Sequence, residues 1–352
     1  MHLINTFLTA VLAVSVVGSP HQPASPPTAN VSVLATFPKP VWNENLAIRG
    51  NGYILTTRFD KPEVYQVNPG TGERLLVRAF DASVYSGCLG IAEGDTDIFY
   101  VISAPPYDDQ LTKINGTNTI FRIDMATFET DGQTIVNNAT VTKVIDIDAA
   151  NILNGMTAYD DNYILVADSV QGIVYEVDLA EGRYVAAVED PKMKATYNTA
   201  SPATPLGVNG IKMFRSYLYW TNTAGGFVAR VPFNSLEGAL GNSSIAITDV
   251  PLADDFIIRD DAVAFVCQNQ VNTLSVAYLD FRPGSGEPSV KASVIAGSLT
   301  STMLAGVSAA EFSRTEGQAY RLYLTTSGAE GKPINGTTTV GSTVSYIDTS
   351  VY

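Results

Sequence analysis

A pattern of three β-rich runs recurs six times along the chain, and no other feature of the sequence constrains the fold as strongly. Each unit has a short apolar run, a second run rich in Tyr, Val, Ile and Leu, and a third run that often ends in Val-Asp or Ile-Asp. From Glu44 in the first unit to Ala305 in the sixth there are 261 residues over five steps, or about 52 per unit. The first runs cover residues 44–48, 88–92, 154–158, 209–213, 254–258 and 306–310.

Strand-rich repeats of this length predict an all-β fold, the β-propeller, in which every blade is a four-stranded sheet. The six units predict six blades, with a seven-bladed ring as the alternative. Outer fourth strands are expected between the units, for example at residues 74–78 and 142–146. Residues 30–37 precede the first unit and can pair with the C-terminal strand, which would close the ring and remove its unpaired edges.

The first 29 residues differ from the rest of the chain. Residues 3–17 are apolar and are followed by Gly18, Ser19 and Pro20, which is typical of a secretory signal peptide. A membrane anchor is the alternative, but the run is shorter than the ~20 residues that a span needs. Residues 20–29 are Pro-rich and are expected to be disordered. We therefore expect a signal peptide at 1–19, a disordered segment at 20–29 and one propeller domain at 30–352.

Glycosylation motifs support a secretory route. Five Asn-x-Ser/Thr sequences occur beside small or polar residues, as is typical of surface loops. We expect a secreted glycoprotein that has no membrane contact once the signal peptide is cleaved. The predicted acceptors are Asn30, Asn115, Asn138, Asn242 and Asn335.

Charge and histidine content exclude several classes of function. The chain has 21 Lys and Arg against 35 Asp and Glu, a net charge of −14, which argues against nucleic-acid binding because phosphate contacts need clustered basic residues. Its two histidines, His2 and His21, both precede the propeller. Ser-His-Asp triads, Cys-His dyads and histidine zinc sites are therefore excluded from the folded body. Any catalysis in the folded body therefore has to use carboxylates, amides, tyrosines or a bound cation.

Aligning the first runs predicts which residues surround the central channel. The ring reads Glu44, Gly87, Asn154, Asn209, Asp254 and Ala305. Four of these six carry side-chain oxygens, and such a set suits Ca²⁺ or Mg²⁺, which prefer several oxygen ligands. The alternative is that Asn-Gly and Asp-Asp mark tight turns at the start of each strand.

The repeat and the ring together resemble the senescence-marker-protein/gluconolactonase family of six-bladed propellers. That resemblance implies a divalent-metal site at Glu44, Asn154, Asn209 and Asp254. Family lactonases usually show Glu-Gly-Pro in blade one and Pro-Asp-Gly in blade five, whereas this chain has Glu44-Asn45-Leu46 and Ala253-Asp254-Asp255. The strings Glu44-Asn-Leu-Ala-Ile and Asn154-Gly-Met-Thr-Ala resemble, among such propellers, the fungal hetero-Diels-Alderases of tropolone sesquiterpenoid biosynthesis.

Residues near the ends of the first strands are expected to line the pocket. Cys88 and Cys267 fall in opposite blades, so buried thiols are expected rather than a disulfide, whose Cα atoms must lie within ~7 Å. Aromatic walls would suit an apolar or planar ligand. The predicted lining residues are Trp42, Tyr85, Cys88, Tyr107 and Phe256.

Three classes of function fit these features. The first, which we favour, is a secondary-metabolite enzyme that makes meroterpenoids: a hetero-Diels-Alderase that joins a tropolone quinone methide to a humulene-type sesquiterpene. That reaction needs no histidine and no cofactor, and it gains most from holding an apolar terpenoid and a polyketide tropolone in register. Glu44, Asn154, Asn209 and Asp254 would be the catalytic groups. The others are a metal-dependent lactonase or esterase and a non-catalytic binding propeller.

Overall fold

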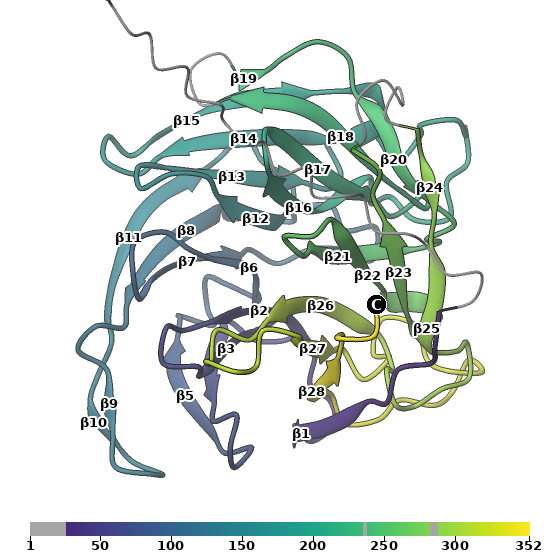
Figure 1. Ribbon diagram of the computed structural model, residues 1–352. Helices are drawn as coiled ribbons and strands as arrows, with labels where there is room; N and C mark the ends of the chain where they lie inside the picture. The colour runs from purple at the N-terminus through teal and green to yellow at the C-terminus, as the bar shows by residue number, and fades with distance from the viewer. Residues whose placement is uncertain (1–25, 235–237, 282–287) are drawn as a thin grey trace, which may run out of the picture.

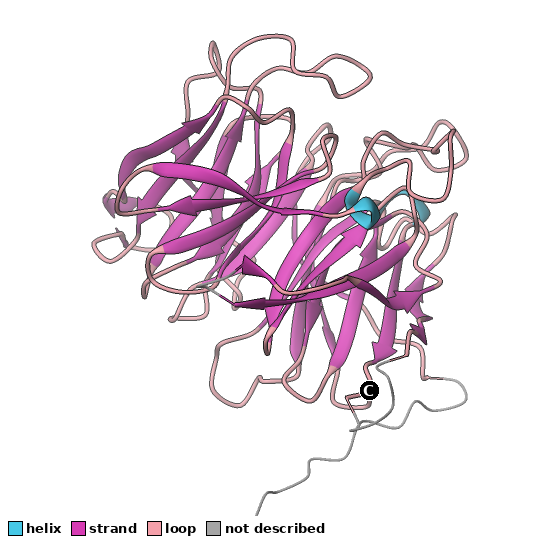
Figure 2. Cartoon of the chain, turned by 90° about the horizontal axis from the view of Figure 1, so that it is seen from above, coloured by secondary structure: helices cyan, strands magenta, loops and turns pink. Residues whose placement is uncertain are grey.

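The chain forms six sheets, each built on four antiparallel strands, that are arranged as blades around one axis (Figure 1). The computed structural model describes residues 26–234, 238–281 and 288–352. Within these ranges the helical structure is limited to two short turns in the loops, η1 (Pro191–Met193) and η2 (Asn269–Val271), and Figure 2 shows that strands make up the rest of the ring. The all-β, six-bladed propeller predicted from the repeats is therefore confirmed.

The first three blades are antiparallel meanders whose strands run in chain order from the channel outward. Blade two also carries a small hairpin, β9 (Glu129–Thr130) with β10 (Ile135–Asn137), between its third and fourth strands. The strands are, in blade one, β2 (Asn43–Ile48), β3 (Ile54–Arg58), β4 (Glu63–Val67) and β5 (Arg74–Ala79); in blade two, β6 (Gly87–Glu93), β7 (Ile98–Ala104), β8 (Asn118–Asp124) and β11 (Thr140–Ile147); and in blade three, β12 (Leu153–Ala158), β13 (Tyr163–Asp168), β14 (Ile173–Asp178) and β15 (Arg183–Glu189).

The last three blades follow the same plan with two additions. In blade four, β24 (Val290–Lys291) lies parallel to the outer strand and β19 (Gly238–Ala239) pairs with the third strand. The strands are, in blade four, β16 (Val208–Phe214), β17 (Tyr217–Asn222), β18 (Phe227–Asn234) and β20 (Ser244–Thr248); in blade five, β21 (Ala253–Ile258), β22 (Val263–Gln268), β23 (Thr273–Tyr278) and β25 (Ser293–Gly297); and in blade six, β26 (Val307–Phe312), β27 (Arg321–Thr326), β28 (Thr343–Asp348) and β1 (Ser32–Thr36).

The N-terminal strand closes the ring, as the position of residues 30–37 predicts. β1 is the outermost strand of blade six and lies beside β28, with Ser32 opposite Tyr346 and Thr36 opposite Thr343 (Figure 1). Each inner strand also contacts the inner strand of the next blade, including β26 of blade six with β2 of blade one. The six inner strands thus form an unbroken wall around the channel.

The hydrophobic core lies between successive blades. Leu89 and Ile102 of blade two, for example, pack in one cluster with Met156 and Val166 of blade three. The two cysteines lie in different clusters and are both buried free thiols, as their opposite blades predict. Burial raises the pKa of Cys88 to about 12 and raises that of Cys267 as well, so neither is a nucleophile at neutral pH.

The predicted signal peptide and residues 20–25 of the Pro-rich segment lie outside the described residues. In the described part of the chain, no helix is long and apolar enough to cross a membrane. All five predicted glycosylation acceptors are exposed and lie outside the strands, so an oligosaccharide could be attached at each of them without disturbing a blade.

Removing the closing strand should destabilise the whole ring. A chain that starts at residue 38 leaves the edge of β28 unpaired, whereas a chain that starts at residue 26 keeps β1. We expect the first variant to lose at least about 5 °C in Tm and to self-associate through the free edge, as measured by calorimetry and light scattering. The second variant is the control and should melt like the full chain. Equal melting of both would show that blade six is stable without β1.

Secretion from a eukaryotic host should give a processed glycoprotein. Peptide-N-glycosidase should lower the mass of the secreted protein, because each acceptor is exposed. Each Asn→Gln change at one of the five acceptors should remove one glycan and make this loss of mass smaller. Mass spectrometry should also find a new N-terminus near Ser19. An intact N-terminus without glycans would contradict the predicted secretory route.

Candidate functional site

A bulge near the start of every inner strand builds the site. In each blade the pairing register of the inner strand shifts within its first five residues, as between Asn43 and Leu46 in blade one and between Ala253 and Phe256 in blade five. An extra residue in a bulge re-aims the neighbouring side chain. The residues directly after the first bulge position form one ring across the blades, which reads Glu44, Leu89, Asn154, Asn209, Asp254 and Ser308.

Two members of the predicted ring were therefore wrong. Gly87 pairs with Ala104 two residues before the ring position, and a methyl group there would lie 2.0 Å from the Phe59 carbonyl oxygen. Ala305 precedes β26 and is buried in a small apolar cluster. The repeat alignment slipped in blades two and six because neither blade has an amide or carboxylate at the ring position.

Five of the six ring positions face a cavity of about 330 Å³ at one end of the channel. This volume lies at the lower end of the range typical of small-molecule pockets. Its walls are largely apolar and its floor is polar. The apolar lining includes Trp42, Phe59, Leu89, Leu111, Ile152, Leu206 and Leu252, and the polar lining includes Glu44, Asn154, Asn209, Thr223, Asp254 and Asn269.

Asp254 is held at the floor by two side-chain amides. Asn209 Nδ2 donates to Asp254 Oδ1 at 2.8 Å, and Asn269 Nδ2 donates to Asp254 Oδ2 at 2.8 Å. Burial raises the pKa of Asp254 to about 7, although these two hydrogen bonds oppose the shift. Because the folded chain binds this proton more tightly than the unfolded chain, the contribution of Asp254 to stability falls as pH rises from about 4 to about 7.

Glu44 is the second carboxyl group of the floor. The indole nitrogen of Trp42 donates to Glu44 Oε2, which fixes both side chains against the pocket wall. Burial, and then the negative charge of Asp254, raise the pKa of Glu44 well above its usual range, while the indole hydrogen bond opposes this. Two buried carboxyl groups that repel each other titrate as a pair. With the pKa of Asp254 raised to about 7 and that of Glu44 raised as well, these two carboxyl groups are the candidates for a proton donor and a proton acceptor at the floor.

Asn154 completes the polar floor. Its side chain is buried and lines the cavity. In the part of the chain that the structure describes, no side-chain hydrogen bond occupies its amide. Asn209, by contrast, is bound to both Asp254 and Thr223. Asn154 is therefore the amide that is free to bind a ligand oxygen.

As they lie, the four predicted metal ligands do not fit a hard cation. Both oxygens of Asp254 accept amide protons, and Asn209 turns its nitrogen rather than its oxygen toward Asp254. A Ca²⁺ or Mg²⁺ ion at this site would require the Asn209 amide to rotate.

Of the five residues predicted to line the pocket, the structure places only Trp42 there. Phe256 comes two residues after the ring position and is fully buried in the core between blades. Cys88 comes one residue before the ring position in blade two and has its Sγ 3.6 Å from Ser103 Oγ. Tyr107 donates to Asn118 Oδ1 at 2.9 Å and packs against the core of blades two and three. Tyr85 packs against Phe80 and Phe121 beside the core between blades one and two.

Several lining residues were missed by the sequence analysis. Thr223 and Asn269 each come directly after the second strand of their blade. Because only the first strands were aligned in the sequence, these positions were not compared between blades. Leu89 was missed through the register slip described above. Leu111 lies in the loop between β7 and β8 of blade two, and Leu206 lies in the loop between blades three and four. No repeat signal exists in these loops, so only the folded chain brings both residues to the pocket.

The floor carboxyl groups should titrate near neutrality, and Trp42 reports on them. With Trp220→Phe, the described chain keeps Trp42 as its one tryptophan. As pH rises through about 7 the pair gains negative charge beside the indole, so the emission of Trp42 should change with a midpoint near pH 7. Adding Asp254→Asn should move or abolish that midpoint. A flat profile from pH 5 to 9 would contradict the coupled pair.

Comparison with known proteins agrees with this architecture. No protein-family model matches the chain. Over 341 residues the chain is 24% identical to a protein of Sarocladium schorii provisionally named hetero-Diels-Alderase asR5. The aligned region covers 86% of this chain and 79% of that protein.

Solved propellers share the fold at low sequence identity. A luciferin-regenerating enzyme superposes with a TM-score of 0.62 at 11% identity, over 91% of this chain and 95% of that one. A provisionally assigned gluconolactonase superposes with a TM-score of 0.57 at 12% identity, over 93% and 94% of the two chains. The chain is thus a six-bladed β-propeller with the fold of gluconolactonase-like proteins, and its sequence resembles a protein named as a hetero-Diels-Alderase.

Proposed function

We propose that the pocket catalyses a hetero-Diels–Alder reaction that joins a tropolone quinone methide to a humulene-type sesquiterpene. One observation carries the proposal: two buried carboxyl groups, Glu44 and Asp254, lie at the polar floor of a cavity whose walls are largely apolar. The similarity to a protein provisionally named a hetero-Diels-Alderase supports the class of reaction. An apolar wall suits the terpenoid, and a polar floor suits the oxygens of the tropolone.

The carboxyl pair can prepare the reactive partner. A hydroxymethyl tropolone becomes a quinone methide by losing water: the ring hydroxyl gives up its proton, the exocyclic C–O bond breaks, and the leaving hydroxide takes a proton. The ionised member of the pair accepts the first proton and the neutral member donates the second, so the pair has exchanged roles and one water has left. Such positioned proton transfer typically contributes 10²–10⁴-fold in rate.

The cycloaddition itself needs no proton transfer. The alkene of the terpenoid forms one C–C and one C–O bond with the four-atom O=C–C=CH₂ unit as the six electrons rearrange. Holding both partners in register can remove ~7–11 kcal/mol of the barrier. The unoccupied amide of Asn154 can donate a hydrogen bond to the quinone-methide oxygen, where negative charge develops.

A metal-dependent lactonase is the second candidate. The convergence of Glu44, Asn154, Asn209 and Asp254 on one cavity supports it, whereas the amide protons on both oxygens of Asp254 speak against it. In either case we expect the enzyme to act on a small molecule along the secretory route.

Removing either carboxyl group should abolish most of the dehydration step. With a hydroxymethyl tropolone and humulene as substrates, Glu44→Gln and Asp254→Asn should each lower kcat/KM by about 10²-fold or more, because each leaves one proton transfer unassisted. Product formation followed by chromatography and mass spectrometry measures this. With a pre-formed quinone methide the loss should be much smaller.

Matched surface changes serve as controls. Glu181→Gln and Asp161→Asn alter exposed residues in turns of blade three, between β14 and β15 and between β12 and β13, that do not line the pocket, and both should keep wild-type rates. The wild type should also be indifferent to EDTA. If the protein hydrolyses simple lactones and EDTA abolishes that activity, the lactonase replaces this proposal. If both ring variants, Glu44→Gln and Asp254→Asn, keep wild-type activity, the carboxyl pair has no part in the mechanism.

A further inference from the structure

The channel holds two separate cavities, one at each end. The candidate reaction pocket lies at the end where the ring residues lie, and a second cavity of about 290 Å³ lies at the ends of the inner strands. The second cavity is lined by Ala47, Ala92, Thr157, Lys212, Glu311 and Arg314, among others. The two cavities share no lining residue. One layer of residues therefore closes the channel between them.

That layer consists of the residues that directly follow the ring position in each blade. In three blades it is a glycine, and each glycine lets the neighbouring inner strand approach. A methyl group at Gly155 would lie 2.2 Å from the Asn209 carbonyl oxygen, and one at Gly210 would lie 2.2 Å from Asp255 Oδ1. The other members are Asn45, Asp255 and Ala309, all buried.

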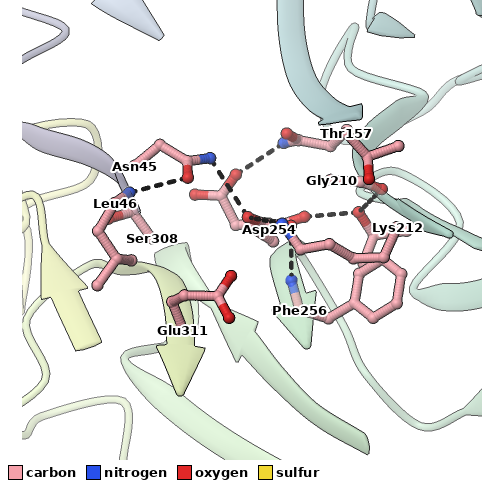
Figure 3. Close-up of polar contacts among 12 residues, drawn as sticks. Asn45, Leu46, Thr157, Gly210, Lys212, Asp254, Phe256, Ser308 and Glu311 are labelled. Atoms are coloured by element: carbon pink, nitrogen blue, oxygen red, sulfur yellow. Dashed lines mark hydrogen bonds and ion pairs between the residues drawn. The ribbon is translucent and has the colours of Figure 1, made fainter. Parts of the chain in front are cut away.

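One carboxylate ties three blades together inside this layer. Asp255 Oδ2 accepts from Lys212 Nζ of blade four at 3.0 Å and from Asn45 Nδ2 of blade one at 3.3 Å. Its other oxygen accepts from the Phe256 backbone at 2.8 Å, and the Asn45 amide oxygen likewise accepts from the Leu46 backbone at 2.8 Å. Figure 3 shows Asn45 and Lys212 among these polar contacts, with Glu311 nearby.

The tie lies directly against the candidate site. Asn45 follows Glu44 and Asp255 follows Asp254, so both floor carboxyl groups are attached to the tied residues. Only 16% of the Lys212 side chain and 5% of the Asp255 side chain are exposed. A buried ion pair is retained where it fixes a geometry, since burial costs it much of its Coulomb energy.

We propose that Lys212, with Asp255 and Asn45, seals the floor of the reaction pocket against water from the opposite end of the channel and fixes the spacing of Glu44 and Asp254. Lys212 is a positioning residue, because it lines the second cavity and acts through Asp255. The seal matters to the reaction proposed above, on which this inference rests: a quinone methide that meets water adds it at the exocyclic carbon, the ring oxygen regains the proton, and the hydroxymethyl precursor re-forms.

The test counts how often the quinone methide returns to water. In H₂¹⁸O, each return places ¹⁸O in the recovered precursor, so the ratio of ¹⁸O exchange to cycloadduct measures leakage. Lys212→Met with Asp255→Asn removes both charges and avoids an unpaired buried carboxylate. This ratio should rise at least about fivefold in the double variant, because closure of a site is what excludes water from it. Lys212→Arg should restore a ratio close to wild type.

A second measurement needs no substrate. Hydrogen–deuterium exchange of peptides covering residues 45–46 and 255–256 should speed up in the double variant, while peptides from β13 stay protected. Lys291→Met breaks a solvent-exposed ion pair with Asp249 and is the control in both measurements.

The outcomes separate the two proposals. If the double variant shows wild-type hydrogen–deuterium exchange at the floor and a wild-type ¹⁸O ratio, the proposed seal is overturned. A uniform loss of protection in all blades would also overturn it, because it would show a purely structural role. If the chain forms no cycloadduct at all, the proposed reaction fails, and the local exchange at residues 45–46 and 255–256 still decides whether Lys212 closes the floor.

Discussion

The pairing of β1 with β28 is the interaction on which the rest of the structure depends. A ring of twisted sheets has defined geometry only when it is closed, and here closure is made by backbone hydrogen bonds between residues near the two ends of the chain. Once the ring is closed, each inner strand is held between two neighbours. Six bulges in equivalent places then form the ring, and five of the six ring side chains face the pocket at one end of the channel.

The channel brings charges together in a place where charge is costly. Glu44, Asp254 and Asp255 are all buried near the axis, and Lys212 is the cation that pairs with one of them. Burial raises the pKa of Glu44 and of Asp254, and the negative charge of a neighbouring aspartate adds to it: Asp254 for Glu44, and Asp255 for Asp254. The unpaired carboxyl groups therefore face the pocket in a form that can both donate and accept a proton, whereas the paired carboxylate below them binds the blades together.

This division of roles follows from a difference of one residue. Asp254 and Asp255 are neighbours in the chain, yet the bulge directs Asp254 into the pocket and Asp255 into the layer beneath it. Asp254 accepts hydrogen bonds from two side-chain amides, and Asp255 accepts one from the ammonium group of Lys212. Glu44 and Asn45 are divided in the same way in blade one.

Sequence reasoning reached the fold because strand periodicity and a repeat of about 52 residues are local signals that survive without an alignment of relatives. It also reached Glu44, Asn154, Asn209 and Asp254, since each precedes an apolar run in the same phase. It misplaced Gly87, Ala305, Tyr85, Cys88, Tyr107 and Phe256, because one or two residues of register decide whether a side chain faces the channel or the core.

The sequence by itself thus determined the six-bladed ring, its closure by the N-terminal strand, the absence of histidine chemistry and four polar groups around the channel. Only the tertiary structure decided how those groups act. The coupling of Glu44 with Asp254, the amides that saturate Asp254, and the Lys212–Asp255 tie join residues up to 210 positions apart in the chain. Such contacts depend on the closed ring and on the bulge in each inner strand. No local pattern in the sequence encodes how close these residues lie in the folded chain.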